Sequence, residues 1–310
     1  MTADQLVYLV FGIVILLALV FDLGVFSRKN KEISIKTALW QSVFWVGLAL
    51  AFGAFMWYIE GEKAAMEYLS AYLMEKSLSV DNIFVFILIF SFFRIRADHV
   101  PRALFIGIIL AIVFRIIFIT VGVALVERFH WILYVFGAFL VYTGIKIFAV
   151  RHEDEFDPAN SPVYRFLNRF FPIIHEDIGG KMTVVRDGKR FYTNMFAVVV
   201  MLGTTDIVFA VDSIPAVFAI SQDKLVIYTS NIFAVLGLRA LYFLLKGAVA
   251  KFEYLQQGIA IVLVFIGLKM LVGIFGIHVP TYISLIFIVI CLVGSMGYSL
   301  QVANRRANNE

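Results

Sequence analysis

The chain has 310 residues, of which 62% are hydrophobic, and its mean hydropathy is +0.92. Soluble domains are about 45 to 50% apolar, so this composition excludes a soluble protein and predicts one that crosses a membrane several times. A formal charge of +4 would suggest nucleic acid as a partner of a soluble protein, but here the basic residues fall in short loops between apolar segments. We therefore expect the lipid bilayer as the main partner and no nucleic acid.

Nine apolar segments are long enough to cross a hydrocarbon core about 30 Å thick. They cover residues 5–26, 36–59, 67–93, 101–126, 131–150, 194–221, 225–247, 255–275 and 280–302. The sequence thus predicts an all-α polytopic membrane protein with a single transmembrane domain over residues 1–310. The first segment is too long for the apolar part of a signal peptide, so we expect it to be a retained helix.

Lysine and arginine residues in the loops predict the orientation. Eleven of them lie on the side that holds the carboxyl terminus and three on the other side, with the long loop 151–193 left out. Because basic residues favour the cytoplasmic side, the amino terminus is expected outside and the carboxyl terminus in the cytoplasm.

The long loop 151–193 contains two patterns of its own. TVVRDGKRFYT alternates around Asp187 and Gly188, which is typical of a β-hairpin. The acidic run His152–Asp157 is either a solvated charge cluster or a weak cation-collecting patch at a cytoplasmic mouth, and the sequence leaves both readings open.

An internal repeat relates segments three to five, residues 67–150, to segments six to eight, residues 194–275. The matched positions are Glu75 and Asp206, Asp81 and Asp212, Asn82 and Ser213, Arg115 and Arg239, Gly144 and Gly267, and Lys146 and Lys269. Each copy has an odd number of helices, so the second enters the membrane from the opposite side. Such inverted repeats are typical of secondary transporters, whose substrate sites lie near the midplane, and the three remaining helices are expected to form a surrounding scaffold.

The repeat places polar side chains where a spanning helix should carry none. Burying one charge there costs roughly 2.5 to 3.5 kcal/mol, so a compensating function is expected. Both stretches supply oxygen atoms and contain no cysteine or histidine, which favours manganese, magnesium or calcium over copper or zinc. The candidate metal ligands are Glu75, Asp81, Asn82, Asp206, Asp212 and Ser213.

The spacing of the acids predicts interrupted helices. In a regular helix Asp81 points about 120° away from Glu75, so the two carboxylates could meet only if the helix is broken between them. In the second copy, Pro215 has no amide hydrogen and would leave the carbonyl of Val211 free as a cation ligand. In the first copy, Ser79 could cap a similar break, so we expect discontinuities in the third and sixth segments.

Arg115 and Arg239 are expected to be the counter-ions of the four acids. They could exchange partners when a cation enters, which would couple binding to movement, or they could form static salt bridges that orient helices. Four acids against two arginines leave negative charge over, even if Lys76 contributes. Protons and metal ions could neutralise this surplus alternately, which is how an antiporter works. We expect protons as the coupling ion, no permanently bound cofactor and no enzymatic activity.

The strings EKSLSVDNIFVF, DIVFAVDSIPAVFA and SNIFAVLGLRALYFLL resemble the signature segments of the TerC family of bacterial integral membrane proteins. Nine spans with a cytoplasmic loop after the fifth resemble its Alx-like branch. The resemblance implies a relation to the LysE superfamily, a location in the inner membrane and export of manganese from the cytoplasm. It also implies that Glu75, Asp81, Asn82, Asp206 and Asp212 bind the cation. The tellurium resistance that named the family transfers less well, because surplus carboxylates would repel the tellurite oxyanion.

The leading hypothesis from the sequence is a manganese exporter driven by proton exchange. A rival of another class is a membrane interaction protein that assembles stress-response partners or assists metallation, in which the buried charges are structural only. A third reading is a calcium/proton exchanger, which differs from the first only in its substrate.

Overall fold

The structure is a computed structural model that describes residues 3–21, 34–149, 161–174, 176–186, 188–246, 254–275 and 279–309. The acidic run His152–Asp157 lies outside the described residues. The helices are α1 (Ala3–Phe21), α2 (Ile35–Glu60), α3 (Glu62–Phe92), α4 (Val100–Arg128), α5 (Ile132–Ala149), α6 (Pro162–Phe170), α7 (Asn194–Ile220), α8 (Lys224–Leu236), α9 (Leu238–Leu245), α10 (Leu255–Val272), the 3-10 turn η4 (Gly273–Phe275) and α11 (Thr281–Asn309). The strands are β1 (Ile173–Ile174), β2 (Thr183–Arg186) and β3 (Lys189–Thr193).

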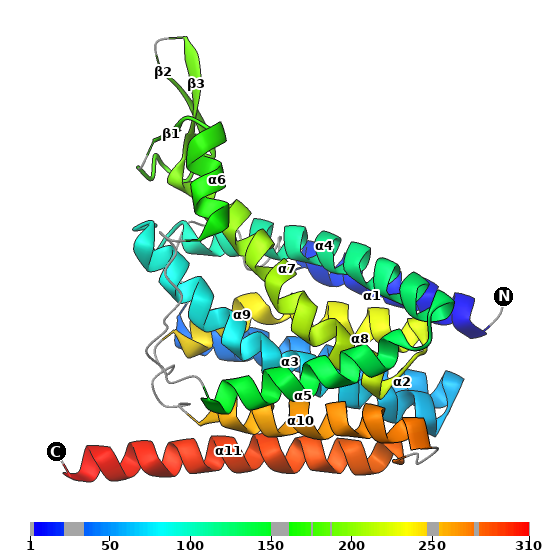
Figure 1. The fold of residues 1–310 in the computed structure, drawn as a ribbon. Coiled ribbons are helices and arrows are strands. Elements are labelled where there is room, and N and C mark those ends of the chain that lie inside the picture. The colour runs from blue at the N-terminus through cyan, green and yellow to red at the C-terminus, as the bar shows by residue number, and fades with distance from the viewer. Residues whose placement is uncertain are drawn as a thin grey trace.

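The long helices form a membrane-spanning bundle, as the composition predicts (Figure 1). Counted over the described residues alone, six apolar stretches are long enough to cross a membrane, and two shorter apolar helices lie at Gln5–Ala18 and Ile132–Ile147. The all-α polytopic fold is therefore confirmed. The exact count of nine spans and the inverted repeat remain predictions.

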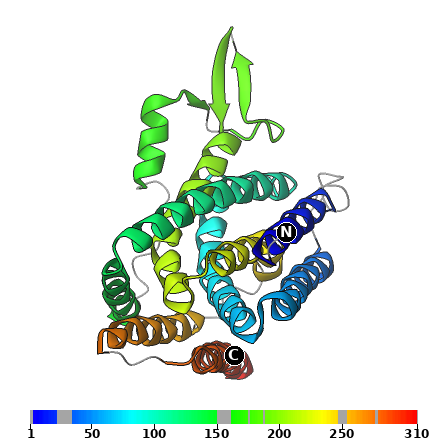
Figure 2. The same ribbon diagram turned by 90° about the vertical axis from the view of Figure 1, so that its right-hand side faces the viewer.

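The bundle has a buried centre and a lipid-accessible edge. In an apolar 18-residue window of the stretch Lys224–Leu245, which holds α8 and α9, 89% of the residues are buried inside the protein, whereas only 22% are buried in the corresponding windows of α2 and α11. Figure 2 shows α11 at the edge of the bundle. α2 and α11 therefore present apolar surface to lipid, as expected of a surrounding scaffold, and α8 and α9 form the core.

Glycine residues bring α5 and α10 into close contact. A Cβ atom added at Gly267 in α10 would lie 2.6 Å from the carbonyl oxygen of Gly137 in α5, and one at Gly144 would lie 2.7 Å from the carbonyl oxygen of Ala260. Small residues allow the backbones of membrane helices to approach in this way. Gly144 and Gly267 are also matched positions of the predicted repeat.

The segment between α5 and α7 folds into α6 and a small sheet, which project from one end of the bundle (Figure 1). The sheet has the order β1-β3-β2, with β1 parallel and β2 antiparallel to β3. Val184 pairs with Phe191, and Gly188 in the turn has a φ of 73°, a conformation that favours glycine. The hairpin lies where the sequence predicts one. We refer to residues 161–193 as the α6–sheet module.

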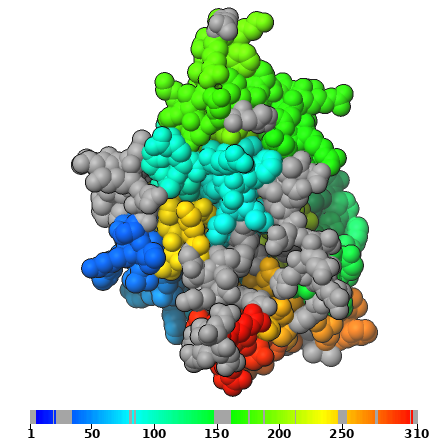
Figure 3. All heavy atoms as spheres, turned by 90° about the vertical axis from the view of Figure 1, so that its left-hand side faces the viewer, coloured from blue at the N-terminus to red at the C-terminus, as the bar shows by residue number. Residues whose placement is uncertain are grey.

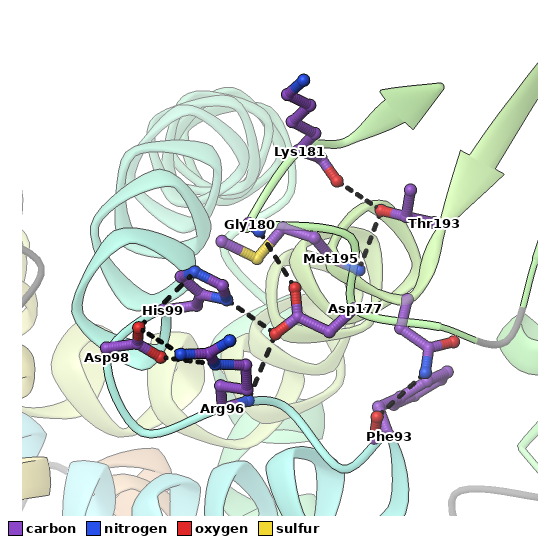
Figure 4. A network of polar contacts seen from close by, with 10 residues as sticks. Phe93, Arg96, Asp98, His99, Asp177, Gly180, Lys181, Thr193 and Met195 are labelled. Carbon is purple, nitrogen blue, oxygen red and sulfur yellow. Dashed lines mark hydrogen bonds and ion pairs between the residues drawn. The ribbon is translucent and has the colours of Figure 1, made fainter. Parts of the chain in front are cut away.

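A polar network fastens the α6–sheet module to the start of α4 (Figure 4). The Nδ1 atom of His99, just before α4, lies 2.7 Å from Oδ2 of Asp177, and both side chains are buried. The backbone N–H groups of Gly180 and Arg96 also donate to the Asp177 carboxylate, at 3.0 and 3.2 Å. Gly180 has a φ of 66°, and a Cβ there would lie 3.0 Å from the His99 ring, so only glycine fits.

These contacts perturb the pKa of Asp177. Burial alone would raise it, but the hydrogen bond from His99, the two backbone donors and the charge of His99 outweigh burial and lower the pKa below its ordinary value of 3.8. The ionised carboxylate therefore stabilises the attachment of the module.

Gly267→Ala should lower the stability of the protein by about 1 to 3 kcal/mol, because the new methyl group would collide with the α5 backbone, which has little room to move. Thermal unfolding in detergent measures the change. Gly294→Ala in α11 is the matched control, since nothing lies within 4 Å of a Cβ at that position. Equal unfolding midpoints for the two variants would contradict close packing of α5 on α10.

Asp177→Asn should destabilise the protein at neutral pH, because the variant loses a charge that the folded state favours. The difference from wild type should be fully present above pH 3.8 and should shrink as the pH falls through the lowered pKa of Asp177. Thermal unfolding across this pH range provides the measurement. Glu176→Gln is the control, since its ion pair with Arg186 is exposed and contributes little. If the difference in stability between Asp177→Asn and wild type did not change with pH, the ionised state assigned to Asp177 in the folded protein would be wrong.

Candidate functional site

Four helices converge on one buried guanidinium group. Arg115 of α4 is 1% exposed and forms ion pairs with Glu75 of α3 and Asp206 of α7. Its Nη1 group also donates to Oδ1 of Asn231 in α8, at 3.1 Å. These residues come from chain segments that are far apart, so only the packing of the bundle brings them together. We call Arg115, Glu75, Asp206 and Asn231 the central polar cluster.

The carboxylates of the central polar cluster hold the guanidinium group of Arg115 in one orientation. Asp206 accepts two hydrogen bonds, from Nη2 of Arg115 to Oδ1 at 3.1 Å and from Nε to Oδ2 at 3.4 Å. Such two-point pairing fixes the plane of the guanidinium group. Glu75 accepts from Nη1 of Arg115 through its Oε2 atom. The arginine is thus held from two sides by carboxylates of different helices.

Local contacts orient the partners of Arg115. The Nδ2 group of Asn231 donates to the carbonyl oxygen of Ile227 one turn earlier, at 2.9 Å, which leaves Oδ1 free to accept from the arginine. The hydroxyl of Ser79 donates to the backbone carbonyl oxygen of Glu75, at 2.7 Å. Both bonds run back along the helix axis, as side chains of this kind do in apolar helices.

The central polar cluster carries a surplus negative charge. One guanidinium faces two carboxylates, and Asn231 is neutral. Glu75 and Asp206 are 1% and 0% exposed, and Oε1 of Glu75 has no hydrogen-bond partner among the described residues. An unbalanced charge in such a place is costly, so it creates a demand for a proton or a cation.

The remaining predicted ligands are placed only in part. Asn82 and Ser213 are buried at 2% exposure, and among the described residues neither Oδ1 of Asn82 nor Oγ of Ser213 has a hydrogen-bond partner. The side chains of Asp81 and Asp212, which precede them, lie outside the described ones. Over the part of the chain that the structure describes, no group of three or more acidic, histidine or cysteine side chains is close enough to hold a metal.

The structure differs from the prediction of interrupted helices. α3 is continuous from Glu62 to Phe92, and α7 is continuous from Asn194 to Ile220 with Pro215 inside it. The hydroxyl of Ser79 bonds within α3 and does not cap a break, and the side chain of Val211 is 49% exposed. The expected break is therefore wrong for both helices, because a single proline removes one backbone bond while the surrounding packing maintains the helix.

The interruption occurs in the seventh apolar segment instead. α8 ends at Leu236 and α9 begins at Leu238, with Gly237 between them. Lys76 of α3 reaches this junction, where its Nζ group donates to the carbonyl oxygen of Ala234 at 3.2 Å. A Cβ at Gly237 would lie 2.4 Å from that Nζ atom, so the glycine provides the space for the ammonium group. A lysine here satisfies a carbonyl near the end of a helix.

Arg239, the second predicted counter-ion, is also buried, at 3% exposure, and it lies in the first turn of α9 just after Gly237. The structure thus places both predicted arginines inside the bundle. Arg115 pairs with Glu75 and Asp206, which belong to the two polar stretches identified in the sequence.

Sequence reasoning missed two residues of this region. Asn231 was not among the predicted ligands, although an amide in the middle of an apolar segment is a usable signal. From the sequence, Lys76 is considered only as a contributor to the charge balance of the acids. Its partner on α8 has no signature in the sequence, since it is a backbone carbonyl.

Comparison with known proteins places the chain in a family. The sequence profile of the family described as "Integral membrane protein TerC family" matches residues 60–307. A membrane protein of Myxococcus xanthus, STKORF319, is 44% identical over 282 residues, covering 91% of this chain and 88% of its own length. A membrane protein of Rickettsia felis is 42% identical over 286 residues, covering 92% of this chain and 94% of its own length.

A third relative is Alx of Escherichia coli strain K12, which is named as a candidate membrane-bound redox modulator. It is 41% identical over 284 residues, covering 89% of this chain and 88% of its own length. No solved structure matches the chain significantly. Since the family profile and these relatives cover most of its length, the chain belongs to the TerC family of integral membrane proteins.

Proposed function

We propose that this protein is a secondary transporter that exports divalent cations, manganese first among them, from the cytoplasm in exchange for protons. The observation that carries the proposal is the surplus negative charge of the central polar cluster, where one arginine faces two buried carboxylates. Buried acids inside a membrane bundle mark ion pathways and proton relays. The distribution of basic loop residues supports an outside amino terminus and a cytoplasmic carboxyl terminus in the inner membrane.

The chemistry of the nearby groups favours a hard cation. The central polar cluster offers carboxylate and amide oxygens, and seven residues further along α3 and α7 Asn82 and Ser213 have buried oxygens without a partner among the described residues. Manganese, calcium and magnesium prefer such ligands. Asp81 and Asp212 remain part of the proposed ligand set by their positions in α3 and α7 beside Asn82 and Ser213.

The arrangement suggests how binding and movement could be coupled. Arg115 is permanently charged and ties α3, α4 and α7 together through Glu75 and Asp206. A cation that competes for these carboxylates must displace the guanidinium, which would loosen the three helices from one another. A proton that arrives on a carboxylate balances the surplus charge and allows the ion pairs to re-form. The alternation of a divalent cation and protons at these carboxylates is therefore the proposed driving step.

If the buried charges only hold the helices together, their loss should change stability and not transport. One variant can therefore distinguish a structural role of the central polar cluster from a role in transport. Glu75→Gln removes the surplus charge but retains a carbonyl oxygen that accepts from Arg115. We expect manganese flux into proteoliposomes to fall about tenfold or more, because replacing a group at or next to a metal site typically lowers metal affinity or activity by that much. The thermal stability should stay unchanged or rise, because an unbalanced buried charge is gone.

The matched control for Glu75→Gln is Glu176→Gln, which makes the same chemical change at an exposed position outside the bundle. It should leave flux and stability at wild-type values. Arg115→Met serves as a second reference, since it leaves two carboxylates without their cation and should cost about 3 to 5 kcal/mol of stability. Wild-type manganese flux in Glu75→Gln would refute the assignment of this site, and flux that declines only in proportion to stability would favour a purely structural role.

Competition between metals tests the identity of the substrate. Manganese uptake into inside-out proteoliposomes should be reduced by less than half in the presence of about a tenfold excess of calcium. Calcium prefers a flexible site, whereas the helices around the proposed site are closely packed. The same vesicles should release protons when manganese enters, and a pH-sensitive dye inside them detects this. Equal inhibition by equimolar calcium would reassign the protein as a calcium/proton exchanger.

A further inference from the structure

The α6–sheet module extends sideways from the bundle. In Figure 1 the spanning helix α11 lies horizontally. α6 and the hairpin of β2 and β3 extend upward, transverse to α11, next to the start of α4. Figure 2 looks along α11 and shows the hairpin reaching beyond the outline of the helices. Figure 3 shows the same overhang from the opposite side. A segment that leaves a membrane bundle in this direction runs along the bilayer surface.

One side of α6 is suited to the edge of a bilayer. Leu167 is 2% exposed and faces the protein, while Phe166 and Phe170 are 55% and 62% exposed and their ring centroids lie 4.6 Å apart. Four residues of separation place the two rings on the same side of the helix, and Asn168 lies on the opposite side. Exposed aromatic side chains of an amphipathic helix are typically buried at the boundary between headgroups and acyl chains.

The charge of the module complements an anionic surface. Residues 161–193 contain six basic and three acidic side chains. Of the acids, Asp177 is buried in the network with His99, and Glu176 is paired with Arg186. Lys189 and Arg190 are exposed on β3, and Arg169 of α6 lies beside the ring of Phe170. Basic side chains next to inserted aromatic rings are the combination that attracts anionic lipid headgroups.

The attachment to the bundle keeps the module at a constant depth. The His99 and Asp177 contact joins it to the start of α4, and the amide of Asn194, at the start of α7, donates to the backbone carbonyl oxygen of Phe93 at 2.9 Å. Tyr164 of α6 packs edge to face on the rings of Phe92 and Phe93 at the end of α3. The α6–sheet module is therefore attached to the ends of α3 and α4, and β3 continues directly into α7, at the level where the membrane surface must lie.

We propose that the α6–sheet module is a lipid-binding element: Phe166 and Phe170 insert into the adjoining leaflet while Lys189, Arg190 and Arg169 bind its anionic phospholipid headgroups. This inference does not depend on which ion is transported. It requires only that the long helices span the membrane.

A fluorescence experiment on the full-length protein tests the proposal. Cys291 is the only cysteine of the chain, so Cys291→Ser provides a background in which a single cysteine can be labelled with an environment-sensitive fluorophore. The probe is placed by Phe170→Cys or, as the matched control on the opposite side of α6, by Asn168→Cys. Each protein is reconstituted into vesicles of phosphatidylcholine, with or without phosphatidylglycerol, that contain lipids with a quencher near the headgroup.

Lipid quenching of the probe at 170 should exceed that of the probe at 168 by about threefold or more, and aqueous iodide should show the reverse order. Phosphatidylglycerol should increase the quenching at 170, and Lys189→Glu together with Arg190→Glu should abolish that increase. Phe166→Cys repeats the measurement on the same face, and size-exclusion chromatography verifies folding of each variant. Equal lipid quenching at 168 and 170, or full access of iodide to position 170, would overturn the proposal and would favour a soluble protein as the occupant of this face.

Discussion

A guanidinium group stays charged even in the interior of a membrane bundle and therefore needs carboxylate partners there, and most of the described architecture follows from meeting that condition for Arg115. Its charge has no water to solvate it, so Glu75, Asp206 and Asn231 must approach from three other helices. This requirement draws α3, α4, α7 and α8 to a common point. The extensive burial of α8 and α9 follows, because the helices that surround Arg115 leave the seventh segment in the centre.

The same interaction underlies the exchange that we propose for this site. The central polar cluster has two carboxylates and one guanidinium, so its formal charge is negative by one unit. A closely packed bundle holds such an imbalance only if a mobile positive species can relieve it. Oxygen ligands accept both protons and hard divalent cations, and the alternation of the two at one place is the transport cycle that we propose. Lys76 donates to the α8 carbonyl of Ala234 beside the break at Gly237, so the side chain of this buried lysine has a backbone partner.

The α6–sheet module illustrates a second constraint, that a membrane protein must satisfy the boundary between lipid and water. His99 and Asp177 bury a charged contact at the end of α4, which ties a polar segment to the apolar bundle at a defined level. Above that level the chain uses ordinary antiparallel pairing around Gly188, and beside it α6 exposes Phe166 and Phe170. The aromatic rings and the basic residues are thus presented together at the height where headgroups lie.

Patterns that depend on neighbouring residues were predictable from the sequence. Apolar length marked the spanning helices, the alternation around Gly188 marked the hairpin, and acids in apolar segments marked Glu75 and Asp206 as members of a buried site.

Contacts between distant segments were not predictable in this way. Nothing local indicates that Asn231 completes the shell of Arg115, that Lys76 fills the space at Gly237, or that His99 meets Asp177. The expected breaks beside Ser79 and Pro215 failed for the same reason, since the packing of the whole bundle decides whether a helix with one missing bond continues. By itself the sequence determined which positions place a charge inside an apolar segment and therefore need a partner, because the cost of burying charge depends on residue type. Only the tertiary structure decided which of them touch, because the packing of non-adjacent helices sets those distances.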